Sequence, residues 1–552
     1  MRIKKIRIAG YRSINEAIDL ELGGVNALIG ANNVGKTNIL NAIWSVLGKD
    51  WVTVNSFEEK DVNREDSEKD IDIEVEFEEP YQYHQYKGIN PINIPKIAFK
   101  YTKYKRGEYA GQRRLEKKCL KDDNPVQVFT GRPQKKQKSK FQPLTTIPQV
   151  VQEDLPVIYI RSNRELRYQL PDSKNSLLGA LLNDVNKDFE NPENKITVKN
   201  KSDEDIEISR IERFNQCIKA AIESLKTKEF LALEKSIKDN ALSHLGIDPE
   251  SSNIDISFQP LTSLDFYKSL NLFVKENGYS SNAIDLGSGF QNALVIAILK
   301  AFEERKKSGA LFLIEEPEMF LHPQMQRSLY KTIRKIGETN QVIYTTHSPH
   351  FVTIPEYDEV FLVSKNSDGE TVRRKSSLKK NTVLEEKLRK ELDPERNELF
   401  FSKKVLFVEG DTEKLAIPEY AKREEYDLDN AGVTIVEVGG KRNLKMFADI
   451  AISFGIPTGL IYDTDSSDFS DKSEEETFNQ KLENYSQDGV SVWKFDKNYE
   501  DELRNALTED KYQKACQKYG RKKTIRARLI AQDESYEIPE FIKPITKWLV
   551  EN

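Results

Sequence analysis

Residues 30–37 read GANNVGKT, a pattern from which the fold of the first half of the chain can be inferred. It fits the pattern G-x-x-x-x-G-K-[ST], in which backbone N–H groups wrap phosphates, the lysine reaches the terminal phosphate oxygens and the hydroxyl holds Mg²⁺. The apolar run 25–29 predicts a strand that leads into the loop, and residues 36–47 predict a helix that follows it. We therefore expect a nucleotide site formed by these residues: Gly30, Asn33, Gly35, Lys36 and Thr37.

A second part of this site is predicted much further along the chain. The apolar run 311–314 ends in the sequence EEPE at 315–318. A carboxylate at a strand end beside a phosphate loop can bind Mg²⁺ or orient the attacking water. We assign Glu315 to the magnesium and Glu316, as a catalytic residue, to the water, with a simple acidic turn as the alternative. The long separation from Lys36 predicts an ATPase core that is split by a large insertion.

Two apolar runs in the last third of the chain also end in acids. Residues 405–413 read VLFVEGDTE, and residues 460–465 read LIYDTD. Glycine after Glu409 lets the chain turn sharply. Converging carboxylates repel one another unless a divalent cation lies among them, and Mg²⁺ or Mn²⁺ prefers such oxygen ligands. The sequence therefore predicts a metal site suited to phosphodiester chemistry, with acidic loop edges as the alternative.

The composition of this 552-residue chain excludes several classes of protein. Its length predicts about two to four domains. No apolar run approaches the ~20 residues that span a bilayer, and the first residues lack the apolar core of a signal peptide. Cys119, Cys217 and Cys516 have no paired spacing, which indicates a reducing, cytoplasmic compartment. A net charge of −6 excludes a uniform basic coat, so contacts with nucleic acid are expected from a local patch such as the basic stretch 100–140, for which a solvated loop is the alternative.

Two further motifs follow the order of a known ATPase family. Residues 286–291 read LGSGFQ before an apolar helix, and residues 345–348 read TTHS after an apolar strand. With the phosphate loop and the acidic strand, this ordered set resembles the ABC-type ATPase heads of SMC, Rad50 and RecF proteins. The resemblance implies ATP held between two heads, contacted by Ser288 and Gly289 of one head and by the switch histidine His347, and hence a homodimer or a higher homo-oligomer. Taken singly, a surface turn and a capping histidine are the alternatives.

The acids of the last third resemble those of the TOPRIM fold of topoisomerases, primases and nucleases. An ABC-type head followed by TOPRIM in one chain closely resembles the OLD (overcoming lysogenization defect) nucleases, the family of the Gabija nuclease subunit and of retron-associated effectors. The resemblance implies two metal ions and the following ligands: Glu409, Glu413, Asp463, Asp465 and Glu500. It also implies that Glu409 and Asp463 act in catalysis. Asp501 and Glu502 are alternatives to Glu500.

The same resemblance implies a late catalytic lysine. Lys523, in the run KKTIRA at 522–527, matches a residue that stabilises charge on the cleaved phosphate. This chain has Thr524 where the family often has proline, and a solvated basic helix is the alternative interpretation. Residues 436–441, VEVGGK, match the family's turn between the two acidic strands.

We therefore expect an α/β fold. The chain should begin with an ABC/SMC-like ATPase head that contains an inserted helical segment, and a TOPRIM domain should follow the head. We expect the head at 1–170 and 261–396, a helical insertion with a role in dimerisation at 171–260, and TOPRIM at 397–552. The polar stretch 365–396 is expected to connect head and TOPRIM. In TOPRIM, strands are expected at these ranges: 404–408, 433–438, 459–462 and 490–495.

The predicted function is an ATP-regulated, divalent-metal-dependent DNA endonuclease that nicks or cuts both strands. The family resemblance places it in anti-phage defence and allows a partner protein of the defence system or a non-coding DNA as a further partner; no membrane partner is expected. The alternative is a RecF/SMC-like clamp that binds DNA for repair without cleavage. The full set of TOPRIM acids favours the nuclease over the clamp, and the ATPase head is not explained by a primase.

Overall fold

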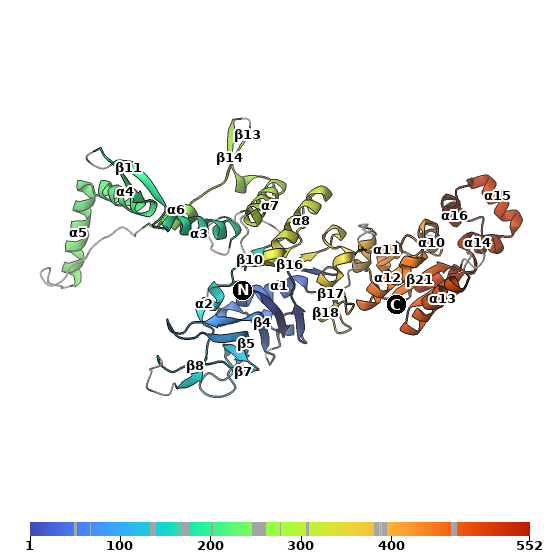
Figure 1. Cartoon of the computed structure of the whole chain (residues 1–552), viewed down its shortest axis with the longest axis horizontal. Helices are drawn as coiled ribbons and strands as arrows, with labels where there is room; N and C mark the ends of the chain where they lie inside the picture. Colours follow the sequence, from blue (N-terminus) through green and yellow to red (C-terminus); the bar gives the residue numbers. More distant parts are fainter. Residues whose placement is uncertain are drawn as a thin grey trace. The chain divides into compact units, whose positions relative to one another are not determined.

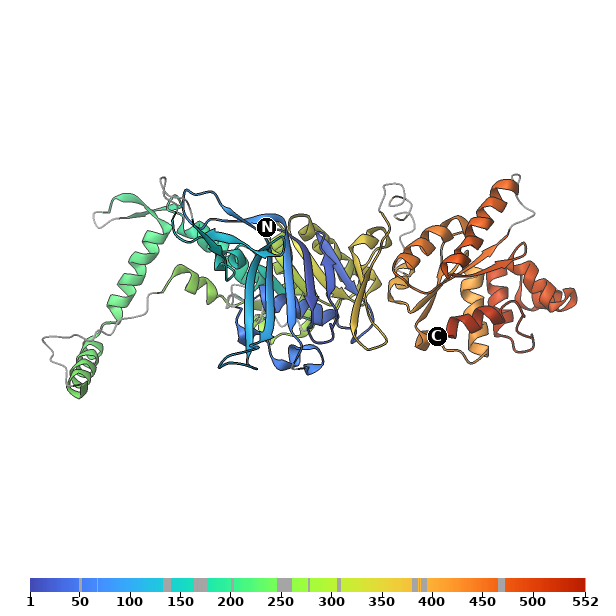
Figure 2. The same cartoon turned by 90° about the horizontal axis from the view of Figure 1, so that it is seen from below.

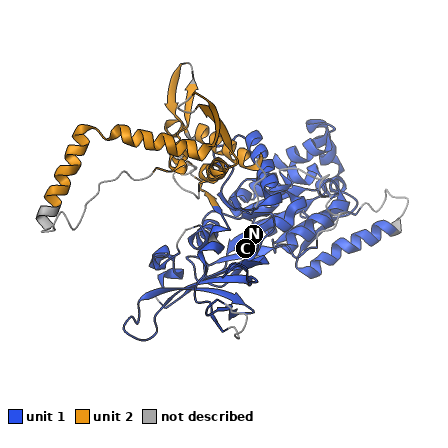
Figure 3. Ribbon diagram, turned by 60° about the vertical axis from the view of Figure 1, so that its left-hand side comes forward, with its two compact units in different colours: residues 1–157, 308–552 blue, residues 158–307 orange. Residues whose placement is uncertain are grey.

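The computed structural model describes residues 1–48, 52–66, 68–132, 140–162, 166, 170, 176–199, 203–245, 261–276, 278–304, 309–379, 386, 388, 395–464 and 472–551. The chain divides into two compact units (Figure 3). Unit 1 comprises Met1–Val157 and Ser308–Asn552, and unit 2 comprises Ile158–Lys307. Both the phosphate loop and the TOPRIM acids belong to unit 1.

The first sheet of unit 1 is antiparallel and has the strand order β2-β1-β4-β5-β6-β7. Isoleucine, valine and phenylalanine alternate with acids in the first half of β4, and these apolar side chains are buried, as the sequence predicts. The strands are β1 (Ile3–Ala9), β2 (Ile18–Glu21), β4 (Ile71–Tyr83), β5 (Ile92–Lys103), β6 (Arg113–Lys121) and β7 (Asn124–Pro125). The hairpin of β8 (Gln127–Phe129) and β9 (Phe141–Pro143), helix α2 (Gln149–Glu153) and strand β10 (Val157–Ile160) follow.

The second sheet of unit 1 carries the phosphate loop. Strands β15 (Leu311–Glu315), β16 (Gln341–Thr346), β3 (Val25–Ile29) and β17 (Val360–Lys365) are parallel neighbours in that order. The carboxyl ends of parallel strands meet at one sheet edge, so the segments after β3, β15 and β16 come together there. Helices α1 (Lys36–Leu47) and α8 (Pro323–Thr339) follow β3 and the acidic turn. The strand 25–29 and the helix 36–47 confirm the sequence prediction.

The stretch predicted to be a polar connector contains a strand. β18 (Thr371–Lys375) pairs with β17 in an antiparallel hairpin and so belongs to the same sheet. Only Thr371 is buried, Arg374 is exposed and the other three residues are half-buried, which explains why an edge strand can have the polar sequence TVRRK. The prediction of a connector over the whole of 365–396 is therefore wrong for this strand.

The last part of unit 1 is a parallel sheet with the strand order β20-β19-β21-β22, surrounded by helices (Figure 2). The strands are β19 (Lys404–Val408), β20 (Val433–Glu437), β21 (Thr458–Asp463) and β22 (Ser491–Phe495), within a residue of the predicted ranges. The helices are α10 (Asp411–Arg423), α11 (Leu428–Ala431), α12 (Lys441–Ser453), α13 (Lys472–Glu483), α14 (Tyr499–Leu507), α15 (Glu509–Tyr519), α16 (Lys523–Gln532) and α17 (Lys543–Val550). A core that includes Val408, Ile461 and Tyr499 joins strands and helices.

Unit 2 is mostly helical, but it contains two hairpins that the sequence analysis missed. Its helices are α3 (Leu177–Glu190), α4 (Arg210–Leu225), α5 (Lys228–Leu245), α6 (Ser263–Lys268) and α7 (Ser288–Glu304) (Figure 1). The hairpins are β11 (Lys195–Lys199) with β12 (Asp205–Ser209), and β13 (Phe273–Glu276) with β14 (Tyr279–Asn282). The run KITVK alternates like a strand, yet it is too short to stand out between helical patterns. No helix among the described residues is both long and apolar enough to cross a membrane.

Candidate nucleotide and nuclease sites

The phosphate loop between β3 and α1 depends on its two glycines. Gly30 has φ 142° and Gly35 has φ 105°, a region that side chains disfavour. A Cβ at Gly30 would lie 2.1 Å from the carbonyl oxygen of Val363, and one at Gly35 would lie 2.1 Å from Oγ1 of Thr371. Thr371 also donates from Oγ1 to the carbonyl of Val34 at 2.7 Å. Strand β18 therefore supports the loop directly.

Lys36 begins α1 with its ammonium turned back into the loop. Its Nζ donates to the carbonyls of Gly30 at 2.9 Å and Ala31 at 2.8 Å. Burial lowers the pKa of Lys36 to about 8, although the carboxylates of Glu316 and Glu318 raise it. A lysine beside the N-terminal end of a helix makes a site that favours anions such as phosphates.

The remaining residues predicted to bind the nucleotide lie in three places. Asn33 is within the loop at φ 62°, and Thr37 is in the first turn of α1. Glu315 is the last residue of β15 and is 8% exposed. Ser288 and Gly289 begin α7 in unit 2, and a Cβ at Gly289 would meet no heavy atom within 4 Å. This turn is therefore open.

Glu316 and His347 follow the neighbouring parallel strands β15 and β16. Oε1 of Glu316 lies 3.8 Å from Nε2 of His347. The backbone N–H of Glu316 donates to the carbonyl of Thr345 at 3.0 Å, which fixes the acid at the strand end. Burial lowers the pKa of His347, Lys36 lowers it further and Glu316 raises it. The imidazole is therefore neutral at neutral pH, and three of the predicted residues lie around one site.

Glu318 also belongs to this site, although no role was predicted for it. Its Oε1 accepts a hydrogen bond from the backbone N–H of His347 at 2.6 Å. Burial raises the pKa of Glu318, and the hydrogen bond from His347 lowers it. The sequence shows Glu318 as the last acid of EEPE, but it does not show that this acid contacts His347. That contact depends on the pairing of β15 with β16.

Glu409 and Asp463 meet at the ends of β19 and β21, which are parallel neighbours. Oε1 of Glu409 accepts a hydrogen bond from the backbone N–H of Asp463 at 2.8 Å. The carbonyl of Glu409 accepts one from the N–H of Gly440 at 2.9 Å. The two predicted catalytic acids thus occupy one corner of the sheet, together with the start of α12.

Glu413 and Glu500 come from the first turns of α10 and α14. Glu413 is 5% exposed, and burial raises its pKa to about 7, with further increases from Glu500 and Asp411. Nζ of Lys523, at the start of α16, lies 3.8 Å from Oε2 of Glu500. Glu500, which helps to raise the pKa of Glu413, therefore lies near an exposed cation.

Asp501 and Glu502, the alternatives to Glu500, already have other partners. Asp501 accepts from the side chain of Asn498 at 3.2 Å and lies 3.1 Å from Nζ of Lys497. Glu502 accepts from the backbone N–H of Asp496 at 2.8 Å. The charge of Glu500 raises the pKa of Glu413, which favours Glu500 as the acid of the site.

The donor set at this corner suits a divalent cation. Its members are carboxylates, the hard oxygen ligands that Mg²⁺ and Mn²⁺ prefer. Burial raises the pKa of Glu413 because a carboxylate that is shielded from solvent is costly to ionise. Among the described residues no three of these side chains are close enough to coordinate one ion, and Asp465 lies outside the described part of the chain.

Part of the basic stretch predicted to contact nucleic acid is paired with acids. Nε and Nη2 of Arg113 each donate to the carboxylate of Glu59 at 2.9 Å. Nζ of Lys118 lies 2.7 Å from Oε2 of Glu116, which Arg114 also contacts. These pairs reduce the positive field that the sequence alone suggests. Residues 133–139 of this stretch lie outside the described residues.

Comparison with protein families fits this geometry. The family model described as AAA ATPase domain matches residues 1–352. The model described as Overcoming lysogenization defect protein-like, TOPRIM domain, matches residues 400–465. The chain belongs to this ATPase family and carries an OLD-like TOPRIM domain. The resemblance to OLD proteins and the α/β fold class of the sequence analysis are thereby confirmed.

Relatives of this OLD-family protein are similar over different lengths. An OLD nuclease of Thermus scotoductus is 29% identical over 487 residues, 86% of this chain and 84% of the relative. Endonuclease GajA of Bacillus cereus is 24% identical over 80% of this chain and 71% of the relative. The Old nuclease of Escherichia phage P2 is 32% identical over 32% of this chain and 33% of the relative. The OLD-family protein is an endonuclease with an ATPase domain, and its two domains imply use of a nucleotide and a divalent metal.

Proposed function

We propose that this OLD-family protein is an ATP-regulated DNA endonuclease that requires Mg²⁺ or Mn²⁺. The observation that carries the proposal is the contact between Glu409 and Asp463, at the carboxyl ends of adjacent parallel strands. Two half-buried acids are brought to one sheet edge there, and a bound cation would offset the repulsion between their charges. The assignment as an endonuclease with an ATPase domain rests on the family. The requirement for Mg²⁺ or Mn²⁺ is our proposal.

The proposed ligands of two ions are the acids predicted from the sequence: Glu409, Glu413, Asp463, Asp465 and Glu500. Bound ions would stabilise the attacking and leaving oxygens of a phosphodiester. Lys523 is well placed for a catalytic role because its side chain is 68% exposed and its ammonium lies 3.8 Å from Glu500. An exposed cation beside the acids can contact a DNA phosphate and offset the charge that develops on it.

The nucleotide site would bind ATP on the loop that includes Gly30, Asn33 and Gly35. Lys36 would bind the terminal phosphates, Thr37 and Glu315 the magnesium, and Glu316 the attacking water. His347, neutral and beside Glu316, would contact the γ-phosphate. Ser288 and Gly289 would complete the site from a second copy, which makes the active form a homodimer or a higher homo-oligomer.

The helical insertion supports this assembly. Helices α4 and α5, inside the proposed segment 171–260, expose apolar side chains that a lone chain leaves in water: Leu225, Leu231, Leu233 and Ile237. Exposed clusters of this kind are typical of protein interfaces. We propose that this segment dimerises, that 1–170 with 261–396 forms the ATPase head and that 397–552 forms the nuclease domain.

A continuous set of contacts in unit 1 supports regulation of cleavage by the nucleotide. Asn397, which is 5% exposed, donates from Nδ2 to the carbonyl of Pro349 at 2.9 Å and accepts at Oδ1 from the N–H of Ile354 at 3.3 Å. Pro349 follows the switch histidine by two residues. His347 and Pro349 also line a cavity of ≈ 320 Å³ together with Thr434 of β20. The switch segment thus contacts the edge of the nuclease domain.

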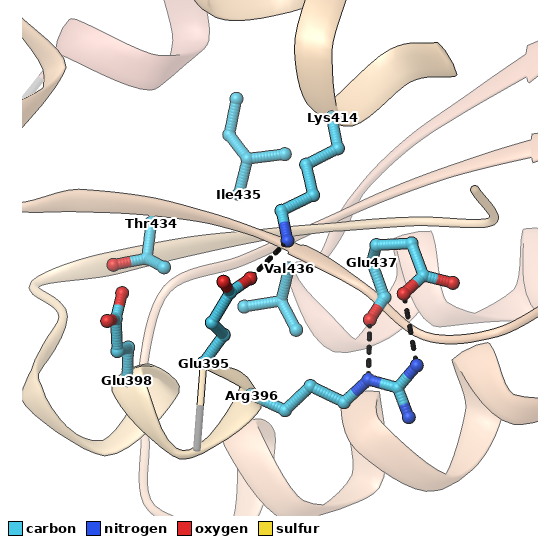
Figure 4. Close-up of a pocket in the computed structure, with 8 residues that line it drawn as sticks. All are labelled: Glu395, Arg396, Glu398, Lys414, Thr434, Ile435, Val436 and Glu437. Carbon is cyan, nitrogen blue, oxygen red and sulfur yellow. Dashed lines mark hydrogen bonds and ion pairs between the residues drawn. The ribbon is translucent and has the colours of Figure 1, made fainter. Parts of the chain in front are cut away.

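The next contacts extend to the acids. Arg396 donates from Nε to the carbonyl of Glu437 at 2.9 Å and from Nη2 to its carboxylate at 3.0 Å (Figure 4). Glu437 ends β20 and accepts from the N–H of Gly439, and Gly440 in turn donates to the backbone of Glu409. A displacement of the switch segment would therefore reach the metal corner through fixed contacts.

The deciding experiment is cleavage of supercoiled plasmid by purified protein with Mg²⁺ or Mn²⁺, with and without ATP. Nicking or linearisation that is lost in Glu409→Ala and in Asp463→Ala would support the metal-dependent nuclease. Lys36→Ala should change the response to ATP while leaving the metal site intact. No cutting by the wild type while ATP is still hydrolysed would favour a DNA-binding clamp instead.

We propose a role in anti-phage defence from the resemblance to the Gabija nuclease subunit. A defence-system partner protein or a non-coding DNA would then act with the endonuclease. Phage plating on cells that carry the wild type, Lys36→Ala or Glu409→Ala tests this role, and equal plating on all three strains would contradict it.

A further inference from the structure

Lys441 is a buried cation beside the proposed metal site, and the proposed function gives it no role. Its side chain is only 5% exposed, although lysine is rarely buried without a partner. It begins α12 directly after Gly439 and Gly440, which have φ 74° and 113°. The turn that only glycines adopt readily thus delivers this lysine into the interior of the nuclease domain.

Within the described part of the chain, the ammonium of Lys441 contacts two oxygen partners. Nζ donates to the carbonyl of Asp463 at 2.5 Å and lies 2.6 Å from Oε1 of Glu475. Glu475 is itself buried and also accepts from Nη2 of Arg442 at 2.8 Å. The carboxylate of Glu475 therefore balances the charge of Lys441. The ammonium of Lys441 also donates a hydrogen bond to the backbone carbonyl of Asp463, a proposed metal ligand.

The backbone of Asp463 is held on both sides as a result. Its N–H donates to Glu409, and its carbonyl accepts from Lys441. The next residue is held as well, because the carbonyl of Thr464 accepts from Nδ2 of Asn479 at 3.0 Å. Asn479 and Glu475 both belong to α13, so this helix fixes the acidic corner partly through Lys441.

Such an arrangement has a chemical consequence for metal binding. A carboxylate binds an ion well only when its backbone sets the direction of the side chain before the ion arrives. Groups that orient ligands without touching the metal typically change its affinity by about 10- to 100-fold. A charged donor makes a shorter and stronger hydrogen bond to a carbonyl than a neutral one does.

We infer that Lys441, with Glu475 as its counter-ion, is a positioning residue that holds Asp463 ready to bind a divalent cation. The inference rests on the proposed metal-dependent function. It predicts that loss of the ammonium lowers the affinity for the ion even where the fold survives. A role in stability alone would predict that affinity returns once the buried charge of Glu475 is removed too.

The test is Mn²⁺ binding to the full-length protein, measured by isothermal titration calorimetry without DNA or nucleotide. Lys441→Met should weaken binding by about 10-fold or more. Lys445→Met is the matched control, because Lys445 lies one turn later on α12, is 52% exposed and pairs with Asp449 at 3.0 Å. Its affinity should stay at the wild-type value.

A double variant separates positioning from stability. Lys441→Met leaves buried Glu475 with Arg442 as its remaining partner and can unfold the domain. Lys441→Met with Glu475→Met replaces the pair by apolar groups, which is often neutral for stability. The folded double variant should regain the thermal stability that the single variant loses but not the Mn²⁺ affinity. Wild-type affinity in either variant would overturn the inference.

Two further outcomes concern the proposed function itself. Asp463→Asn should abolish most Mn²⁺ binding. If the wild type bound no Mn²⁺, or if Asp463→Asn bound it normally, the metal site at this corner would be wrong and the role of Lys441 would fall with it. Loss of binding in Asp463→Asn with normal binding in Lys441→Met would reject the positioning role alone.

Discussion

The backbone N–H of His347 donates a 2.6 Å hydrogen bond to Oε1 of Glu318. The histidine follows β16 and the acid follows β15, so this bond joins the two segments that carry the proposed water-orienting acid and the switch histidine. Since Glu318 also contributes to the charge around Lys36, one acid connects three parts of the nucleotide site.

Glu318→Ala should slow ATP hydrolysis about 10-fold or more while leaving ATP affinity nearly unchanged, because it frees the His347 segment without removing a phosphate contact. Glu318→Gln keeps an oxygen acceptor and should retain more activity. Steady-state hydrolysis together with nucleotide binding measures both effects. Hydrolysis at the wild-type rate by Glu318→Ala would contradict the role of this bond.

Gly35→Ala should abolish nucleotide binding and destabilise the protein. Its Cβ would collide with Oγ1 of Thr371, and its φ of 105° adds strain of about 1–2 kcal/mol for a side chain. Thr371→Ala in the same chain should remove the 2.1 Å contact, but it leaves Oγ of Ser13 at 2.8 Å from the new Cβ and does not remove the backbone strain. Thermal unfolding and nucleotide titration are measured for the wild type, Gly35→Ala and the double variant. Gly131→Ala is the control, because a Cβ at Gly131 would meet no heavy atom within 4 Å.

Without a divalent ion, Glu413 should make the protein less stable as the pH rises. The folded chain keeps this proton up to a pKa of about 7, whereas the ordinary value is 4.5. Between these values the folded state binds more protons than the unfolded state, so the free energy of unfolding falls with increasing pH. Glu413→Gln removes this titration.

The measurement is unfolding in EDTA from about pH 5 to about pH 8. The wild type should lose stability relative to Glu413→Gln across this range, and added Mn²⁺ should reduce the loss. Parallel profiles for the two proteins would show that Glu413 does not titrate there.

Asn397→Ala should weaken the effect of ATP on DNA cleavage while Mn²⁺ affinity stays normal. It removes the acceptor for Ile354 and the donor for Pro349, the contacts that connect the switch segment to Arg396 and Glu437. The control is Arg374→Gln, which removes a different bond to the nuclease domain, the 2.7 Å contact of Nη1 with the carbonyl of Gly455. Plasmid cleavage with and without ATP compares them, and an equal loss of the ATP effect in both would argue against a path through Asn397.

Local patterns predicted most of the elements that carry the sites. The strand 25–29 and the helix 36–47 have the predicted bounds, because a run of apolar residues and a phosphate loop are defined within one short stretch. The strands that end at Glu409 and Asp463 were found for the same reason. The choice among Glu500, Asp501 and Glu502 needed their hydrogen-bond partners, which only the folded chain provides.

Residues that act through distant contacts could not be predicted from the sequence. Thr371 lies in a run that reads as polar, and its role depends on the pairing of β17 with β18 under the loop. Lys441 resembles any lysine at a helix start until Asp463 and Glu475 are seen beside it. The hairpin 195–209 was missed because its two short strands stabilise each other only as a pair.

The support that Thr371 gives to the phosphate loop limits how this gene could be recombined. The ATPase family match ends at residue 352, which suggests a convenient joint before the nuclease domain. An exchange at that joint would transfer the loop without the strand Thr371–Lys375 that Gly35 rests against. Viable chimaeras that pair this ATPase with another nuclease should therefore have crossovers after Lys375.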